Sequence, residues 1–105
     1  MTQKLLGKAD LADLPSRLPN WTYDAKRKAI TRRIRFGSFR EAITFMWAVA
    51  TVADDRNHHP EWSNVYDVVD IALTTHDKGG VTNADVELAS AMDEIAAGFG
   101  QAGDR

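Results

Sequence analysis

The feature that most constrains the fold is the alternation of apolar and polar positions along residues 68–75. Val69, Ile71 and Leu73 fall on every second position, and the residues between them are polar or small. A period of two places the apolar side chains on one face of a β-strand. Another strand-like run, residues 62–66, comes just before it. The two runs predict a β-hairpin.

A second pair of strand-like segments lies earlier in the chain. Residues 21–23 and 29–36 favour strands, and residues 24–27 form the connection between them. In the longer run, Ile30, Ile34 and Phe36 share one face. These segments predict a second antiparallel hairpin.

Two further segments carry helical signals. Residues 9–18 have leucines at helical spacing but contain Pro15, which predicts a short or broken helix. Ser38 and Glu41 form a capping box at the start of a long helix over residues 38–56. We expect its buried stripe to be Phe39, Ala42, Ile43, Met46, Ala50 and Ala53.

A last helix is predicted to begin at Thr82, where Asp85 completes a second capping box, and to end at glycines 98 and 100. Its apolar stripe is Leu88, Ala89, Met92, Ile95, Ala96 and Phe99. The predicted order is therefore α-β-β-α-β-β-α. We expect an α+β fold, a single domain over residues 1–105 with an ordered core at about residues 8–97, in which helices pack on one face of a four-stranded antiparallel sheet.

The composition excludes several classes of function. A formal net charge of −2 gives no sign of an electrostatic nucleic-acid binder, and no apolar run approaches the roughly 18–20 residues that span a bilayer. The absence of cysteine excludes disulfides, thiolate catalysis and cysteine-ligated metals. No N-terminal segment has the pattern of a signal peptide. We expect a cytoplasmic protein without nucleic-acid or membrane partners.

The histidines are the residues best suited to chemistry. The chain has three, and two of them, His58 and His59, are adjacent and precede Pro60. A histidine at the end of a helix can cap it, which is one interpretation of His58. Pro60 favours an extended backbone at His59, so the two imidazoles leave the helix end in different directions. Such imidazoles could flank a small cleft and both deliver and accept a proton.

The third histidine, His76, has the strand parity of the polar face, and we expect it to point away from the helix-covered core. A polar strand end beside a glycine turn suits the wall of a site, and it is equally an ordinary exposed position. Adjacent histidines differ from the i, i+4 spacing that directs two imidazoles at one ion, so we expect no metal. No phosphate-binding glycine loop or G-x-S-x-G motif is present in the sequence.

These histidines belong to a longer pattern of fixed spacing. The pattern is Asp54, three residues, His58-His59-Pro60, five residues, Tyr66, nine residues, His76, eight residues and Asp85. It resembles the signature of the pterin-4a-carbinolamine dehydratases. Residues 58–76 are similar to the central block of that family, and Trp21 stands at its early tryptophan. The resemblance covers roughly residues 8–97.

The resemblance implies dehydration of 4a-hydroxytetrahydrobiopterin, or a related 4a-hydroxytetrahydropterin, to quinonoid dihydropterin and water. This lyase reaction supports tetrahydrobiopterin recycling after an aromatic amino-acid hydroxylase has oxidised its pterin, and it implies no cofactor. By position, the catalytic residues are His58, His59 and His76. We expect His59 and His76 to transfer the protons and His58 to orient the pterin or assist.

The resemblance also implies a set of substrate-binding residues: Asp54, Asn57, Trp21, Pro60 and Asp85. Asp54 stands where many members have glutamate, and Asn57 where some have aspartate, which bears on pterin positioning and not on the reaction class. Asp85 also has an interpretation as the acid of a capping box, which we favour. Trp21 also has an interpretation as a core residue.

A function of a different class is that of a binding protein that assembles a partner. Some animal members of the family are dimerisation cofactors of a homeodomain transcription factor. The helix over residues 38–56 carries Phe45, Val49 and Val52 beside its expected core stripe, which is more apolar surface than one sheet contact needs. Self-association explains the same surface, because the family is tetrameric, and we expect a homotetramer or homodimer. Turnover distinguishes the two classes of function.

Overall fold

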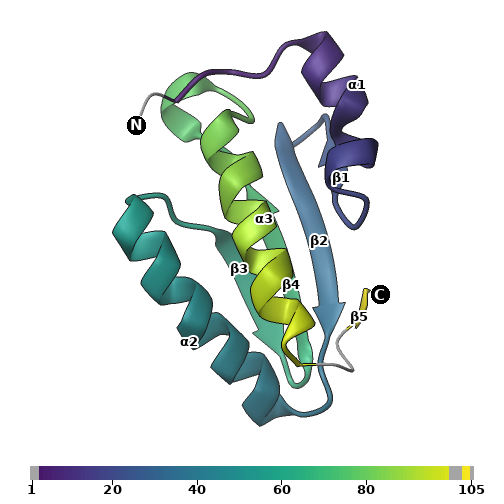
Figure 1. Cartoon of the computed structure of the whole chain (residues 1–105), viewed down its shortest axis with the longest axis vertical. Coiled ribbons are helices and arrows are strands. Elements are labelled where there is room, and N and C mark those ends of the chain that lie inside the picture. The colour runs from purple at the N-terminus through teal and green to yellow at the C-terminus, as the bar shows by residue number, and fades with distance from the viewer. Residues whose placement is uncertain (1–2, 100–102, 105) are drawn as a thin grey trace.

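The two predicted hairpins form one antiparallel sheet, and the predicted helices join them in the expected order (Figure 1). The computed structural model describes residues 3–99 and 103–104. Its elements are α1 (Lys8–Arg17), β1 (Thr22–Asp24), β2 (Ala29–Arg35), α2 (Phe39–Arg56), β3 (Glu61–Val65), β4 (Val68–Leu73), the 3-10 turn η1 (His76–Lys78), α3 (Asn83–Ala97) and β5 (Gly103–Asp104). Apart from η1 and β5, this is the predicted order, and the α+β class is confirmed. Within these ranges, no helix is long and apolar enough to cross a bilayer.

The register of the central strands unites the apolar faces of the two hairpins. The strands lie in the order β1-β2-β4-β3, and β5 pairs with the end of β2. Ile30 of β2 lies opposite Leu73 of β4, and Ile34 lies opposite Val69. Directly opposite residues of an antiparallel pair project from the same face of the sheet. The apolar side chains of both hairpins therefore form one continuous surface.

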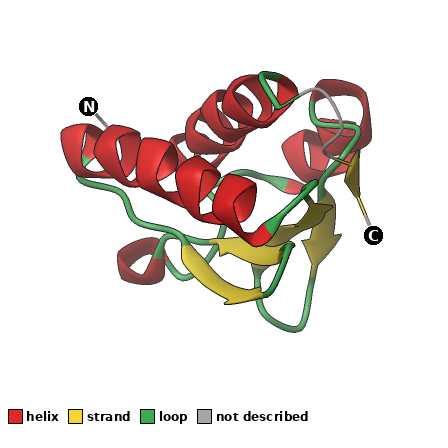
Figure 2. Ribbon diagram, turned by 90° about the horizontal axis from the view of Figure 1, so that it is seen from below, coloured by secondary structure: helices red, strands yellow, loops and turns green. Residues whose placement is uncertain are grey.

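Helices α2 and α3 cover this apolar surface, and none of the described residues forms an α-helix on the opposite face of the sheet (Figure 2). The largest side chains that meet between the two layers have no exposed surface: Ile30, Ile34, Phe45, Val49, Val69, Leu73, Leu88 and Met92. Burial of a side chain of this size is worth about 1.5–3 kcal/mol. This layer is therefore the main hydrophobic contribution to stability, and the helices lie on one face of the sheet, as predicted.

The predicted helix signals act as expected at most helix ends. Ser38 accepts a hydrogen bond from the N–H of Glu41 at 3.1 Å and so caps α2. The reciprocal half of the predicted capping box is not formed, because the Glu41 carboxylate accepts from the N–H of Gly37 at 3.1 Å. At the start of α3, Thr82 and Asp85 form the complete capping box. α1 is short, as predicted, and it continues without a break through Pro15.

The buried face of α2 differs from the predicted one. Its buried residues are Ala42, Phe45, Val49 and Ala53. Three members of the predicted stripe are instead exposed: Phe39, Ile43 and Ala50. The prediction was wrong because α2 is apolar around more than one face, so helical spacing alone does not decide which of two adjacent faces meets the sheet. Phe45 and Val49, assigned to a surplus face, are the core, and the exposed apolar row is formed by Phe39, Ile43 and Trp47.

Backbone pairing continues beyond residues 8–97, where the ordered core was expected to end. The N–H of Leu6 donates to the carbonyl of Val81 at 2.9 Å, and the N–H of Asn83 donates to the carbonyl of Lys4 at 3.3 Å. At the other terminus, Gly103–Asp104 pairs with β2. These contacts are made by backbone groups, which composition does not reveal. Residues 100–102 and 105 of the polar terminus lie outside the described residues.

Candidate active site

The end of α2, the end of β4 and the start of α3 meet at one end of the molecule (Figure 1). His58 and His59 follow α2, and His76 opens η1 just after β4. A cavity of about 270 Å³ lies beside the ends of α2 and β4, and its lining is Gln3, Asn57, His58, His59, Thr74, Thr75, His76 and Asp77. The structure therefore brings the three predicted catalytic histidines to one cavity.

The local backbone explains why the chain turns into this cavity directly after α2. Asn57 adopts a left-handed conformation with φ 50°, which asparagine tolerates better than most residues. The N–H of His58 then donates to the carbonyl of Ala53 at 3.0 Å and closes the helix end. Asn57 is thus the residue that ends α2. The imidazole of His58 does not cap the helix but points to Asp85, which corrects the capping interpretation of His58.

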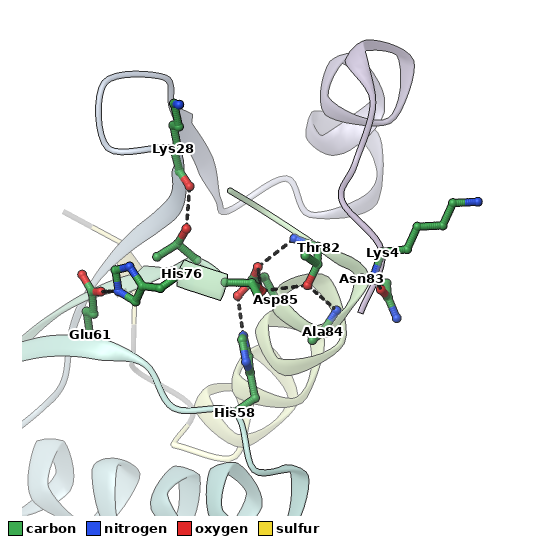
Figure 3. Close-up of polar contacts among 11 residues, drawn as sticks. Lys4, Lys28, His58, Glu61, His76, Thr82, Asn83, Ala84 and Asp85 are labelled. Carbon is green, nitrogen blue, oxygen red and sulfur yellow. Dashed lines mark hydrogen bonds and ion pairs between the residues drawn. The ribbon is translucent and has the colours of Figure 1, made fainter. Parts of the chain in front are cut away.

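Asp85 joins His58 to the start of α3 (Figure 3). Oδ1 of Asp85 lies 2.5 Å from Nε2 of His58, and Oδ2 accepts hydrogen bonds from the Thr75 hydroxyl at 2.9 Å and the Thr82 N–H at 2.8 Å. Asp85 has no exposed surface and His58 is 8% exposed. The capping interpretation of Asp85 is confirmed, and the same carboxylate also holds the imidazole of His58. Its contact with a pterin stays a prediction.

The other two histidines are paired to acids near the surface. Nε2 of His59 lies 3.0 Å from Oδ1 of Asp54, which is in the last turn of α2. Nε2 of His76 contacts Oε2 of Glu61 (Figure 3). The side chains of His59 and His76 are 59% and 79% exposed, so both rings are accessible to a molecule in the cavity. His76 lies outside the helix-covered core, as its strand parity predicted.

Four of the five predicted pterin-binding residues do not line the cavity: Asp54, Trp21, Pro60 and Asp85. Trp21 is 5% exposed, and its indole N–H donates to Oδ1 of Asp93 at 2.8 Å. Arg32 contacts the same oxygen at 2.5 Å. Trp21 is also part of the hydrophobic core, which confirms its interpretation as a core residue. Pro60 is half-buried and does not line the cavity. Their contacts with a pterin stay predictions.

The structure also adds residues that sequence reasoning missed. Gln3 and Thr75 line the cavity, and Glu61 contacts His76. Strand parity places Glu61 on the polar face of the sheet, but its position beside His76 follows from the register of β3 and β4, in which Glu61 lies opposite Ala72. No sequence signal indicated Gln3. Among the residues that the structure describes, no three His, Asp or Glu side chains gather as a metal-binding group.

A larger hollow, of about 480 Å³, lies elsewhere and does not include the histidines. It crosses β2, β3 and β4, and its lining includes Arg33, Ser63 and Asp70. Arg33 and Asp70 pair with each other at 3.5 Å across neighbouring strands. The smaller cavity is the better candidate site, because three histidines, which can transfer protons near neutral pH, line it.

The family model and the related proteins that match this chain name the same family. The sequence model of the family described as pterin 4 alpha carbinolamine dehydratase matches residues 4–95. A protein of Bordetella avium, provisionally named a pterin-4-alpha-carbinolamine dehydratase, is 48% identical over 103 residues, which cover 98% of this chain and 94% of that protein. A Bradyrhizobium protein with the same provisional name is 52% identical over 97 residues, covering 92% of this chain and 97% of its own length.

Solved structures share the fold. The crystal structure of a Brucella melitensis protein described as a transcriptional coactivator/pterin dehydratase aligns with a TM-score of 0.85 and 38% identity, covering 89% of this chain and 99% of that chain. A pterin dehydratase-like protein identified as a RuBisCO assembly factor in the α-carboxysome aligns with a TM-score of 0.64 over 76% of this chain and 93% of its own. Its identity is 23%, so this second likeness concerns the fold alone.

Proposed function

Because the chain belongs to the pterin 4 alpha carbinolamine dehydratase family, we propose that it dehydrates 4a-hydroxytetrahydrobiopterin, or a related 4a-hydroxytetrahydropterin, to quinonoid dihydropterin and water. The observation that carries this proposal is the single cavity lined by His58, His59 and His76. The reaction would serve the recycling of tetrahydrobiopterin after an aromatic amino-acid hydroxylase has used it.

The reaction needs two proton transfers. The bond from C4a to the hydroxyl oxygen breaks while that oxygen receives a proton, and N5 loses its own proton as the new double bond to C4a forms. Imidazole suits both steps, because it can donate or accept a proton near neutral pH. We assign the transfers to His59 and His76, whose side chains are 59% and 79% exposed and therefore within reach of a bound molecule.

His58 has a different place in the proposal. Its side chain is held by Asp85 and is 9% exposed, yet it lines the same cavity. A ring with one fixed orientation can set the position of a flat substrate at little entropic cost. We therefore assign to His58 the orientation of the pterin, and to Asp85 an effect on the substrate that acts through His58.

The cavity volume and its polar lining fit a small heterocycle. About 270 Å³ lies just below the roughly 300–1,000 Å³ of sites for drug-sized ligands. Asn57 lines the cavity with an amide that can both donate and accept hydrogen bonds, which suits the lactam edge of a pterin. Asp54, Pro60 and Trp21 remain proposed as residues that support binding from outside the lining, Asp54 by holding His59.

The proposed enzyme assembles through α2 as a homotetramer or homodimer. Phe39, Ile43 and Trp47 follow one another at intervals of four residues and are 50%, 41% and 77% exposed. A row of large apolar side chains is more typical of an interface than of free surface.

The assembly is tested by substitution in this row. Trp47→Glu should lower the mass measured by light scattering, whereas Ser90→Glu, at an exposed position of α3, should not. A wild-type monomer at micromolar concentration would contradict the assembly.

The proposed activity is tested with purified protein and a 4a-hydroxytetrahydropterin generated in the assay. The expected dehydration rate rises in proportion to protein concentration above the spontaneous rate, and it survives exhaustive chelation because the chemistry needs only proton transfer. Asp70→Asn, which alters an exposed acid outside the cavity, is the control and should retain the rate. A rate equal to the spontaneous one would overturn the proposal and favour a protein that only binds or assembles a partner.

A further inference from the structure

Each site histidine contacts a different carboxylate through the same ring nitrogen, Nε2. The pairs are His58 with Asp85, His59 with Asp54 and His76 with Glu61. An ionised carboxylate only accepts hydrogen bonds, so Nε2 is the donor in each pair. The neutral ring then carries its lone pair on Nδ1. Within residues 3–99 and 103–104, Nδ1 has no hydrogen-bond partner in any of the three rings. The hydrogen-bonding capacity of Nδ1 is therefore unused within the described residues.

Glu61 differs from the other two acids in how it reaches its histidine. It is the first residue of β3, and the pairing of β3 with β4 places it opposite Ala72. β4 then leads within four residues to His76. The pairing of two strands thus carries the carboxylate to the imidazole, although the two residues are 15 positions apart.

The second oxygen of Glu61 faces a cation. Oε1 lies 3.9 Å from Nη2 of Arg27, which belongs to the turn between β1 and β2. The carboxylate therefore lies between a guanidinium and an imidazole. Each oxygen of the carboxylate thus has its own partner, which disfavours rotation of the Glu61 side chain away from His76.

We propose that Glu61 is a positioning residue for His76, which holds Nε2 and leaves Nδ1 to exchange a proton with the substrate. The inference rests on the proposed dehydration. His76 lies in the short turn after β4, and its side chain is 79% exposed. Packing against neighbouring side chains therefore does not fix its ring. Glu61 supplies the constraint that Asp85 supplies for the buried His58.

Glu61 should also stabilise the protonated form of His76 during the reaction. When Nδ1 of His76 accepts the proton from N5 of the pterin, the ring becomes a cation with both nitrogens protonated. The carboxylate on Nε2 stabilises that cation without taking the proton, as in the acid–histidine pair of a catalytic triad. If His76 instead begins protonated, Nδ1 delivers the proton to the leaving hydroxyl and the same contact fixes its direction. Both assignments require Glu61 at Nε2.

The test replaces Glu61 by Gln, whose amide can donate as well as accept and so no longer dictates which ring nitrogen is protonated. We expect Glu61→Gln to lower kcat by about 10- to 100-fold with little change in KM, because a small misplacement of a proton-transfer group acts on the transition state. Asp70→Asn is the matched control: Asp70 lies on the same face of the sheet and pairs with an arginine, Arg33, but contacts no histidine. It should leave kcat unchanged. Glu61→Asp, which keeps the carboxylate, should recover part of the loss.

A second readout does not depend on turnover. The chain has only three histidines, so a ¹⁵N–¹H spectrum of the imidazoles resolves them as three sets of signals. Glu61→Gln should move the set of His76 and leave those of His58 and His59 in place. Unchanged His76 signals, or a folded Glu61→Gln variant with kcat within about twofold of wild type, would overturn the inference. If wild-type protein shows no turnover, the proposed function fails, and the spectrum alone then decides whether Glu61 holds His76.

Discussion

The pairs His58–Asp85 and His76–Glu61 have the same chemistry in opposite surroundings. Both join Nε2 of an imidazole to one carboxylate oxygen. The side chains of the first pair are 9% and 0% exposed, and its acid accepts two further hydrogen bonds. The side chains of the second pair are 79% and 47% exposed.

This difference separates the stability of the fold from the chemistry of the site. A buried polar group that loses its partner costs about 1–3 kcal/mol, whereas an exposed ion pair contributes about 0–1 kcal/mol. The buried pair should therefore matter to folding and to the site together. The exposed pair should matter to the site alone.

The largest expected effect comes from removing the exposed imidazoles. His76→Ala and His59→Ala should each reduce turnover by about 10²–10⁴-fold, the usual contribution of general acid–base catalysis. Their unfolding midpoints in urea should stay close to that of the wild type, because both side chains are largely exposed. Steady-state kinetics with circular dichroism checks both statements. A large loss of stability in either variant would contradict the statement that the exposed histidines matter to the site alone.

A smaller effect, on stability, is expected when the buried acid is changed. Asp85→Asn replaces an acceptor by an amide that must direct its NH₂ toward at least one of the donors around it. The free energy of unfolding should fall by about 1–3 kcal/mol. This exceeds the roughly 0.3–1 kcal/mol expected for a charge at a helix start alone. Urea unfolding measures it, and a stable but inactive Asp85→Asn variant would contradict the structural half of its assignment.

The smallest effect concerns the coupling within each pair. A double-mutant cycle on stability should give an interaction energy of about 0–1 kcal/mol between His76 and Glu61, as for other exposed pairs. The corresponding cycle for His58 and Asp85 should give a clearly larger value, because neither group can be solvated when the other is removed. Equal coupling energies in the two cycles would show that burial does not distinguish the pairs.

The sequence predicted the elements well because their signals are local. The alternation of Val69, Ile71 and Leu73 fixed the strand and its buried face, and Thr82 with Asp85 marked the start of α3. The approach of three histidines to one cavity was expected from the resemblance and from the ends of the elements. These predictions depend on spacing of a few residues.

The sequence could not predict features that depend on partners distant along the chain. The buried face of α2 was wrong because Phe45 and Val49 compete with Phe39 and Ile43, and only the shape of the sheet decides between them. The contact of Glu61 with His76 depends on the register of β3 and β4. The pairing of residues 4–6 with residues 81–83 joins segments that are far apart in the chain, mostly through backbone groups and once through the Asn83 side chain, which accepts from the N–H of Lys4 at 2.7 Å.

The most direct test of the account is the dehydration rate of the His59→Ala/His76→Ala double variant beside that of the wild type. With both proposed proton-transfer groups absent and the buried His58–Asp85 pair intact, the protein should fold normally and its rate should fall toward the spontaneous one. Losses of the two single variants need not add, since both act on one elimination. A folded double variant that turns over the pterin at a near-native rate would contradict the assignment of proton transfer to this cavity.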